Sequence, residues 1–144
     1  MLNNFIRTSK ELCYTFAMDN EVKNWIAMAE YDLVTSRHML KAGRNVYVVF
    51  MCHMALEKTL KAVVCLKSKK APPKTHDLIY LASLAGVALA PEQRDFIGKI
   101  NNAAVVTRYP EDMKKLVASY PKIVVQMYLK NTREIVKCIK CLVR

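Results

Sequence analysis

Glycine and proline are scarce in this sequence, and no stretch alternates polar and apolar residues. The 144 residues include 3 glycines and 5 prolines, so the chain has few places to reverse direction. Without a period of two, no segment predicts a half-buried β-strand. These absences favour an ordered, helix-rich chain, and its length suits one domain with a single core.

Long apolar runs are also missing. No run reaches the length of a membrane span. Near the N-terminus, Arg7, Lys10 and Glu11 interrupt the apolar residues, so a signal peptide would have no continuous apolar region. We expect a cytoplasmic protein with no membrane contact.

Cysteine is present without a recognisable metal or disulfide pattern. There are 5 cysteines, an odd number, and only Cys138 and Cys141 are closely spaced. One Cys-x-x-Cys pair lacks the second pair of a zinc site, and no strand precedes it as in a thioredoxin-like site. We therefore expect buried free thiols, no metal and no cofactor.

Acidic residues are few relative to basic ones. The sequence has 12 Asp and Glu against 23 Lys and Arg, which gives a formal net charge of +11. Such a charge on a small domain attracts polyanions, of which nucleic acid is the commonest, although solubility alone is an alternative explanation. Basic residues cluster in 67–74, 114–115 and 130–144, and this clustering favours a binding surface.

Apolar periodicity predicts an all-α fold: a bundle of about five helices with an up-and-down core of three long helices and short helices between them. Residues 1–19 are an N-terminal extension, either a loosely attached helix or a tail, and 20–144 are one helical domain. We expect Asp19 and Asn20 to cap a first helix that Gly43 stops. A second helix runs from about residue 46 to 69 and ends before Pro72 and Pro73.

The remaining helices are marked by caps and prolines. Thr75 is a plausible N-cap for a short third helix with Leu84 among its inward residues, and Pro91 begins a fourth that Tyr109 and Pro110 break. Residues 111–118 read as a linking stretch. Ser119 caps the last long helix, in which several apolar positions are spaced for burial: Val124, Tyr128, Ile135, Cys138, Ile139 and Leu142.

A polar stripe follows the second helix. His53, Glu57 and Lys61 are four residues apart and therefore share one face beside an apolar stripe. A solvated Glu57–Lys61 pair would contribute only a few tenths of a kcal/mol. His53 lies between apolar neighbours, so we expect at least one of the three side chains to be partly buried and partnered.

Ionisable residues also gather at the start of the third helix. Asp77 suits helix capping, whereas His76 adjoins a basic loop that contains Lys74. An imidazole there can transfer protons or contact phosphate.

Arg108 stands at the end of the fourth helix, before a proline break. A guanidinium held there can bind phosphate in a bidentate manner, or it can pair with Asp32 or Glu57. The adjacent Tyr109 can stack on a base or close the core.

Four short motifs occur in an order that resembles the HEPN family, small helical domains named for higher eukaryotes and prokaryotes nucleotide-binding. They are Ala-Glu-Tyr-Asp-Leu at 29–33, Glu-Lys-x-x-Lys-Ala at 57–62, Pro-Pro-x-Thr-His-Asp-Leu at 72–78 and Arg-Tyr-Pro at 108–110. The resemblance runs from Asn20 to the C-terminus. It implies a bundle of about five helices, homodimerisation through long helices and a polar cleft for nucleotides or RNA.

The resemblance also suggests a biological setting. Many small HEPN proteins are the toxin-type half of a two-gene module whose other half is a minimal nucleotidyltransferase, and this role is our leading hypothesis. The expected ligand-binding residues are His53, Glu57, Lys61, Lys74, His76, Asp77, Arg108 and Tyr109.

The resemblance leaves catalysis open. HEPN ribonucleases typically carry an Arg, four to six further residues and then a His. Here Arg37 adjoins His38, Arg44 lies nine positions before His53, and no histidine follows Arg108. Two alternatives therefore stand beside the leading hypothesis: a metal-independent endoribonuclease that uses His76 and Arg108 as catalytic residues, and a non-catalytic dimeric adaptor.

Overall fold

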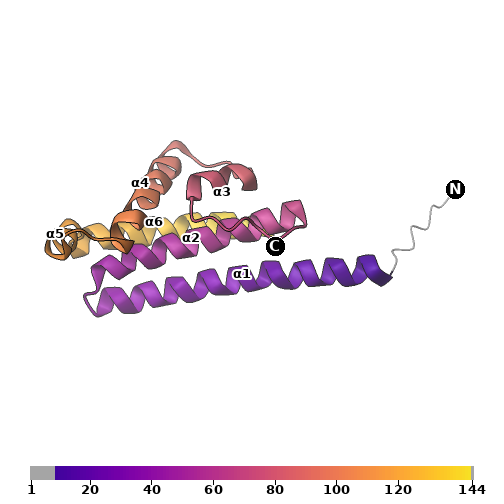
Figure 1. The fold of residues 1–144 in the computed structure, drawn as a ribbon, viewed down its shortest axis with the longest axis horizontal. Helices are drawn as coiled ribbons and strands as arrows, with labels where there is room; N and C mark the ends of the chain where they lie inside the picture. Colours follow the sequence, from indigo (N-terminus) through magenta and orange to yellow (C-terminus); the bar gives the residue numbers. More distant parts are fainter. Residues whose placement is uncertain (1–8, 144) are drawn as a thin grey trace.

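The computed structural model is a helical bundle, and no strand occurs in the residues that it describes, 9–143, with side-chain surroundings given for 19–143. Its elements are α1 (Ser9–Lys41), α2 (Asn45–Ser68), α3 (Leu78–Ala85), α4 (Pro91–Arg108), α5 (Met113–Ser119), α6 (Lys122–Lys140) and the 3-10 helix η1 (Cys141–Val143). Figure 1 shows α1, α2 and α6 running lengthwise, with α3 and α4 against one side of α2. The all-α prediction with three long helices is confirmed. None of the described helices is long and apolar enough to cross a membrane.

The central element is α2, which packs against α1, α3, α4 and α6. Most of its residues are buried, and Leu56 and Leu60 are fully inaccessible. Lys69 ends the helix in the left-handed conformation with φ 55°, and Pro72 and Pro73 prevent the helix from resuming. Because other helices surround α2 on several sides, a polar residue on it must find a partner inside the protein.

The first helix begins earlier than the cap residues predicted. α1 is continuous from Ser9, so Asp19 and Asn20 lie inside it and do not cap it. No glycine or proline interrupts this segment, and helix propagation costs less than starting a new helix. Residues 1–8 of the predicted N-terminal extension lie outside the described part of the chain. Gly43, with φ 69°, terminates α1 as expected.

The cap of α3 is Asp77 and not Thr75. The Asp77 carboxylate accepts hydrogen bonds from the backbone amides of Ile79 and Tyr80, while the Thr75 hydroxyl oxygen accepts one from the amide of Asp77. Thr75 therefore shapes the turn before the helix. Leu84, expected to point inward, is 45% exposed because Ala85 takes the buried position of the last turn.

The C-terminal half of the chain corrects two further predictions. The stretch 111–118 contains a short helix, α5, which Asp112 caps, and Ser119 ends α5 instead of starting α6. Two positions expected to be buried, Cys138 and Leu142, are exposed. The core-facing residues of α6 are Val125, Leu129, Thr132, Ile135, Val136 and Ile139.

Free thiols divide between the interior and the surface. Cys52 and Cys65 are buried as expected, whereas Cys138 and Cys141 are exposed near the end of α6. The expectation of buried thiols is therefore wrong for the Cys-x-x-Cys pair. The side chain of Cys13 lies outside the described residues.

Candidate functional site

A buried carboxylate, that of Glu57, lies at the centre of the polar stripe on α2. The residue is 3% exposed. Its Oε1 accepts a hydrogen bond from Lys61 Nζ at 2.8 Å, and its Oε2 lies 2.9 Å from Nδ1 of His76. Burial alone would raise the pKa of Glu57, but the hydrogen bonds and charges of Lys61 and His76 outweigh it and lower the pKa. Glu57 is therefore ionised and accepts from both partners.

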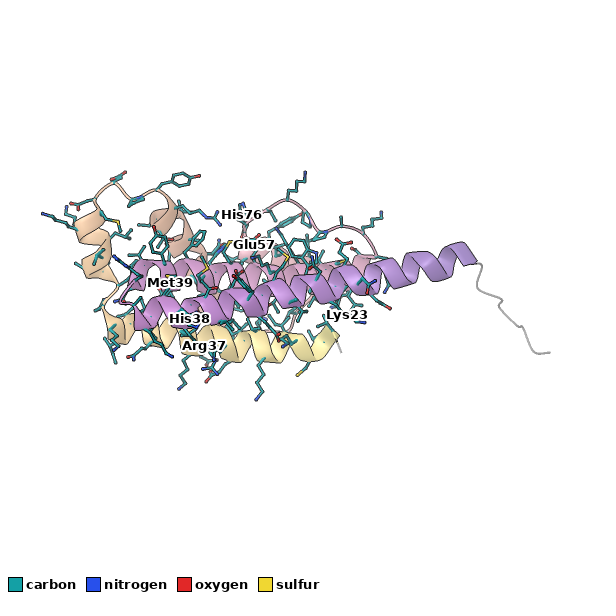
Figure 2. The ribbon with its side chains drawn as sticks, turned by 90° about the horizontal axis from the view of Figure 1, so that it is seen from below. Lys23, Arg37, His38, Met39, Glu57 and His76 are labelled. Carbon is teal, nitrogen blue, oxygen red and sulfur yellow. The ribbon has the colours of Figure 1, made fainter. Side chains whose placement is uncertain are left out.

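His76 comes from the loop before α3, and Figure 2 shows it beside Glu57. A carboxylate has no proton to donate, so Nδ1 of His76 carries the hydrogen of this bond. The side chain is 62% exposed. Nε2 makes no hydrogen bond to any residue in the described range, so this nitrogen is available to solvent or a ligand.

His53 lies one helical turn before Glu57 on α2 and bonds to the loop that carries His76. Its Nε2 donates to the backbone carbonyl of His76 at 3.0 Å, and its Nδ1 lies 3.9 Å from Glu57 Oε2 without a hydrogen-bond partner. Burial lowers the pKa of His53 to about 4, with a further lowering from the charge of Arg108, and Glu57 only partly opposes this. His53 is therefore neutral at pH 7.

Lys61 completes the stripe from the other side of Glu57. It is 6% exposed, and its Nζ also lies 5.5 Å from the centre of the Trp25 ring on α1. This contact is a cation–π interaction. The expectation that at least one side chain of the stripe is partly buried and partnered is confirmed, and all three are buried and bonded. Lys61 holds Glu57, and His53 holds the loop that carries His76.

Asp77 has a structural role in addition to its position beside His76. Besides capping α3, its carboxylate lies 3.4 Å from the side-chain nitrogen of Asn101, whose own oxygen accepts a hydrogen bond from the amide of Leu78. Sequence reasoning missed Asn101. The only sign of Asn101 in the sequence is that this polar residue follows Ile100, which lies on the apolar face of α4.

Arg108 does not pair with either acid that the sequence suggested. Asp32 is bonded to Lys58 Nζ at 2.6 Å, and Glu57 is bonded to Lys61 and His76. The Arg108 guanidinium instead lies over the Phe50 ring, 5.4 Å from its centre, and 3.8 Å from the sulfur of Met54. Within residues 19–143 it has no ion pair.

Two other predicted ligand residues stand at the surface. Tyr109 is 79% exposed, so it does not close the core. Lys74 is exposed and makes no hydrogen bond or ion pair in the described part of the protein. The structure thus joins His53, Glu57, Lys61 and His76 in one cluster, and the charge of Arg108 acts on His53. Among the described residues, Lys74 and Tyr109 have no hydrogen bond or ion pair with this cluster, although Lys74 lies two residues before His76 on the same loop.

Comparison with known proteins decides the family. The model of the HEPN domain matches residues 22–142. The chain belongs to the HEPN domain family.

This HEPN chain resembles the crystal structure of TT1696 from Thermus thermophilus with a TM-score of 0.71 and 17% identity, covering 84% of this chain and 97% of that one. It resembles the crystal structure of ST0689, an archaeal HEPN homologue, with a TM-score of 0.68 and 17% identity, covering 85% and 98%. At such identities the two likenesses concern the fold. No curated protein matches the chain.

The HEPN motifs have clear places in this fold. Asp32, from the first motif, ties α1 to α2 through Lys58, and the second motif supplies Glu57 and Lys61. The third motif supplies His76 and Asp77. The second and third motifs thus meet at Glu57, whose carboxylate fixes the exposed imidazole of His76.

The chemistry available to this cluster is anion binding and proton transfer. Arg108 and Lys74 carry positive charge without a paired acid, and the Glu57-bound imidazole presents Nε2 outward. Within residues 19–143, no three His, Cys, Asp or Glu side chains are grouped to hold a metal ion.

Proposed function

We propose that this HEPN domain binds a phosphate-bearing ligand, a nucleotide or RNA, over the surface formed by His76, Arg108 and Lys74. One observation carries the proposal: the Glu57 side chain, 4% exposed, holds the His76 side chain, which is 62% exposed. Burying the Glu57 carboxylate costs free energy. Apolar contacts alone could attach the loop that carries His76 to α2 without this cost. A fixed, outward imidazole, with Lys74 on the same loop and Arg108 close enough to act on His53, is an arrangement that can recognise phosphate.

The surroundings of His76 support an anionic ligand over a neutral one. Arg108 rests on Phe50 and Met54, which fix the guanidinium without neutralising its charge. Lys74 lies two residues before His76 on a loop that Pro72 and Pro73 stiffen. Glu57, the acid that bonds to His76 among the described residues, is already bonded to Lys61.

Binding to a fluorescent oligouridine and to a labelled nucleotide, measured by anisotropy, tests this proposal. We expect Lys74→Ala and Arg108→Ala each to weaken binding about fivefold or more and to reduce the slope of log affinity against log salt by about one. Lys99→Ala, an exposed lysine on α4, is the control and should leave both values unchanged. Affinity that does not change between low and moderate salt would contradict the proposal.

The family setting completes this proposal. We infer that the protein acts with a minimal nucleotidyltransferase encoded beside it, on the strength of its HEPN membership and small basic domain. A neighbouring reading frame with Gly-Ser followed by an Asp-x-Asp pair would support the inference, and an unrelated neighbourhood would count against it.

A second function, metal-independent RNA cleavage, is favoured by one specific contact. The bond from His76 Nδ1 to Glu57 fixes the ring and leaves Nε2 free, which is how a carboxylate orients a general acid or base. Arg108 would stabilise negative charge on the reacting phosphate. The non-catalytic adaptor is the reading that remains if neither binding nor cleavage is found.

We predict that the isolated protein has no strong ribonuclease activity. Cleavage of RNA requires proton removal and proton donation, and only one histidine of this cluster is exposed, since His53 is buried and neutral. The measurement is incubation with mixed RNA and a chelator, for the parent, His76→Ala and Arg108→Ala. Cleavage by the parent that disappears in both variants would overturn this prediction and establish the second function.

A further inference from the structure

A groove lies between α1 and α6, and none of its described lining residues belongs to the Glu57–His76 cluster. The two helices pack against each other directly and leave a groove of about 510 Å³ between them. Its floor is apolar and consists of Leu33, Leu40, Leu129 and Val136. Figure 2 views the molecule from the side on which α1 and α6 run next to each other, with Arg37 and His38 labelled on α1.

The rim of this groove is basic. Lys130, Arg133, Lys137 and Lys140 line it from α6. An adjoining hollow of about 280 Å³ contains Arg37 and Arg133 together, so cations of both helices meet there.

The acids nearby neutralise only part of this charge. Glu30, the one acid among the described residues that line the hollow, is bonded to Lys140, and Glu134 lines the larger groove but not the hollow. Among the described residues, Arg37 and Arg133 have no ion pair. Two unpaired guanidinium groups facing one hollow repel each other, and an anionic group placed between them would relieve this repulsion.

The apolar floor distinguishes between classes of anionic partner. Nucleic acid is held by contacts to phosphates and by stacking of bases on aromatic rings, and none of the described residues that line the groove is aromatic. A floor of leucine and valine instead matches the apolar stripe of an amphipathic helix, which binds a groove through residues at i, i+3, i+4 and i+7. Residues 126–140 of α6 offer about 21 Å of length, enough for nearly four helical turns.

We propose that this groove docks an acidic amphipathic helix of a partner protein. Its leucine-like side chains would cover Leu33, Leu129 and Val136, and its flanking Asp or Glu would pair with Arg37 and Arg133. A second copy of this chain is a poor occupant, because the same basic rim would face the groove's own cations. The inference goes beyond the proposed nucleotide or RNA binding and does not depend on it.

The test uses two designed helical peptides of about 18 residues with the same leucine stripe, one flanked by Glu and one by Lys. Their binding to the full chain is measured by fluorescence anisotropy. The groove variant is Arg37→Glu with Arg133→Glu. The matched control, Lys23→Glu with Lys99→Glu, makes the same charge change at exposed lysines outside the groove. Circular dichroism of each variant checks that the helices are retained.

We expect the parent to bind the Glu peptide about tenfold or more tightly than the Lys peptide. The groove variant should reverse this preference, and the control should keep it. The proposal is overturned if the parent binds neither peptide, if it binds both equally, or if the control behaves as the groove variant does. Self-association or oligouridine binding that is lost in the groove variant, and kept in the control, would assign the groove to a second copy or to nucleic acid and would also overturn it.

Discussion

At the residue scale, the most informative feature is that Glu57 and His53 are buried on the most enclosed helix. Glu57 is satisfied by two donors, whereas His53 Nδ1 has none and stays neutral. A neutral imidazole can donate to the His76 carbonyl from Nε2 without bringing a second positive charge beside Lys61. Glu57 and His53 therefore together fix the loop that carries His76. Because His53 is neutral, it leaves the ionisation of Glu57 undisturbed.

This arrangement predicts that the protein loses stability in mild acid. The folded-state pKa of His53, about 4, lies below its ordinary 6.5, so the unfolded chain binds a proton first. Stability is complete above pH 6.5 and falls as the pH drops towards 4, by about 2 kcal/mol at pH 5 from this residue. The pKa of Glu57 is also lowered, so the stability that Glu57 contributes is lost only below its ordinary pKa of 4.5.

Urea unfolding at pH 7 and pH 5 measures this effect. His53→Gln keeps a donor for the His76 carbonyl and removes the titration, so the difference between the two pH values should shrink to less than half. His38→Gln, an exposed histidine on α1, should keep the full difference. An equal loss of stability in the parent and in His53→Gln would show that another group is responsible.

Sequence reasoning predicted the composition of this cluster better than its geometry. The spacing of four placed His53, Glu57 and Lys61 on one face, because helical geometry is local. It did not reveal that Glu57 meets His76, since that contact joins residues 19 apart through a loop. The true partners of Asp32 and Asp77, Lys58 and Asn101, lie on neighbouring helices and depend on the packing of the bundle.

At the element scale, helix boundaries were predictable where proline or glycine constrains the backbone. They were less predictable where only the preference of a capping side chain marks the start of a helix. Gly43, Pro72 and Pro91 mark boundaries that the structure keeps, because proline and left-handed glycine exclude helical continuation. The caps proposed at Asn20, Thr75 and Ser119 failed. Capping is worth only about 1 kcal/mol, so neighbouring residues and tertiary contacts decide among nearby candidates.

The cap of α3 provides a prediction at this scale. Asp77→Ala removes the acceptor for two backbone amides and the contact to Asn101, so it should lower the free energy of unfolding by about 1–2 kcal/mol. Asp112→Ala is the matched control, because Asp112 caps α5 with two amide bonds but has no hydrogen bond to another helix within residues 19–143.

Urea denaturation compares the two variants. The loss should be larger for Asp77→Ala, which removes both the cap of α3 and the Asp77–Asn101 contact to α4. Equal losses would mean that the Asn101 contact adds nothing to the cap.

At the scale of the whole molecule, one group of exposed apolar side chains lies at the end of α4 and on α5. We call this the α4–α5 apolar surface, and it comprises Val105, Val106, Tyr109, Met113 and Val117, each at least 50% exposed. An open groove of about 590 Å³ lies beside it, lined by Val105, Val106 and Tyr109 among others. The long helix α2, in contrast, hides its apolar residues within one chain.

This distribution changes the reason for expecting a homodimer. The family resemblance implies homodimerisation through long helices, but α2 buries most of its apolar residues within one chain. We now propose that the α4–α5 apolar surface pairs with its twofold copy, because contiguous exposed apolar patches mark interaction sites and a twofold closure covers one patch with another. The protein should then sediment as a dimer at micromolar concentration.

One pair of substitutions separates this dimer from one formed through the long helices. Val106→Asp places a charge in the α4–α5 apolar surface, and since each interface contains it twice, the dimer should dissociate at concentrations where the parent remains paired. Tyr31→Asp makes the same kind of change at a 74% exposed residue of α1 and should leave the dimer intact. Sedimentation velocity over a range of concentrations distinguishes the outcomes. Dissociation by Tyr31→Asp alone would move the interface to α1, and a parent that stays monomeric throughout would remove the dimer altogether.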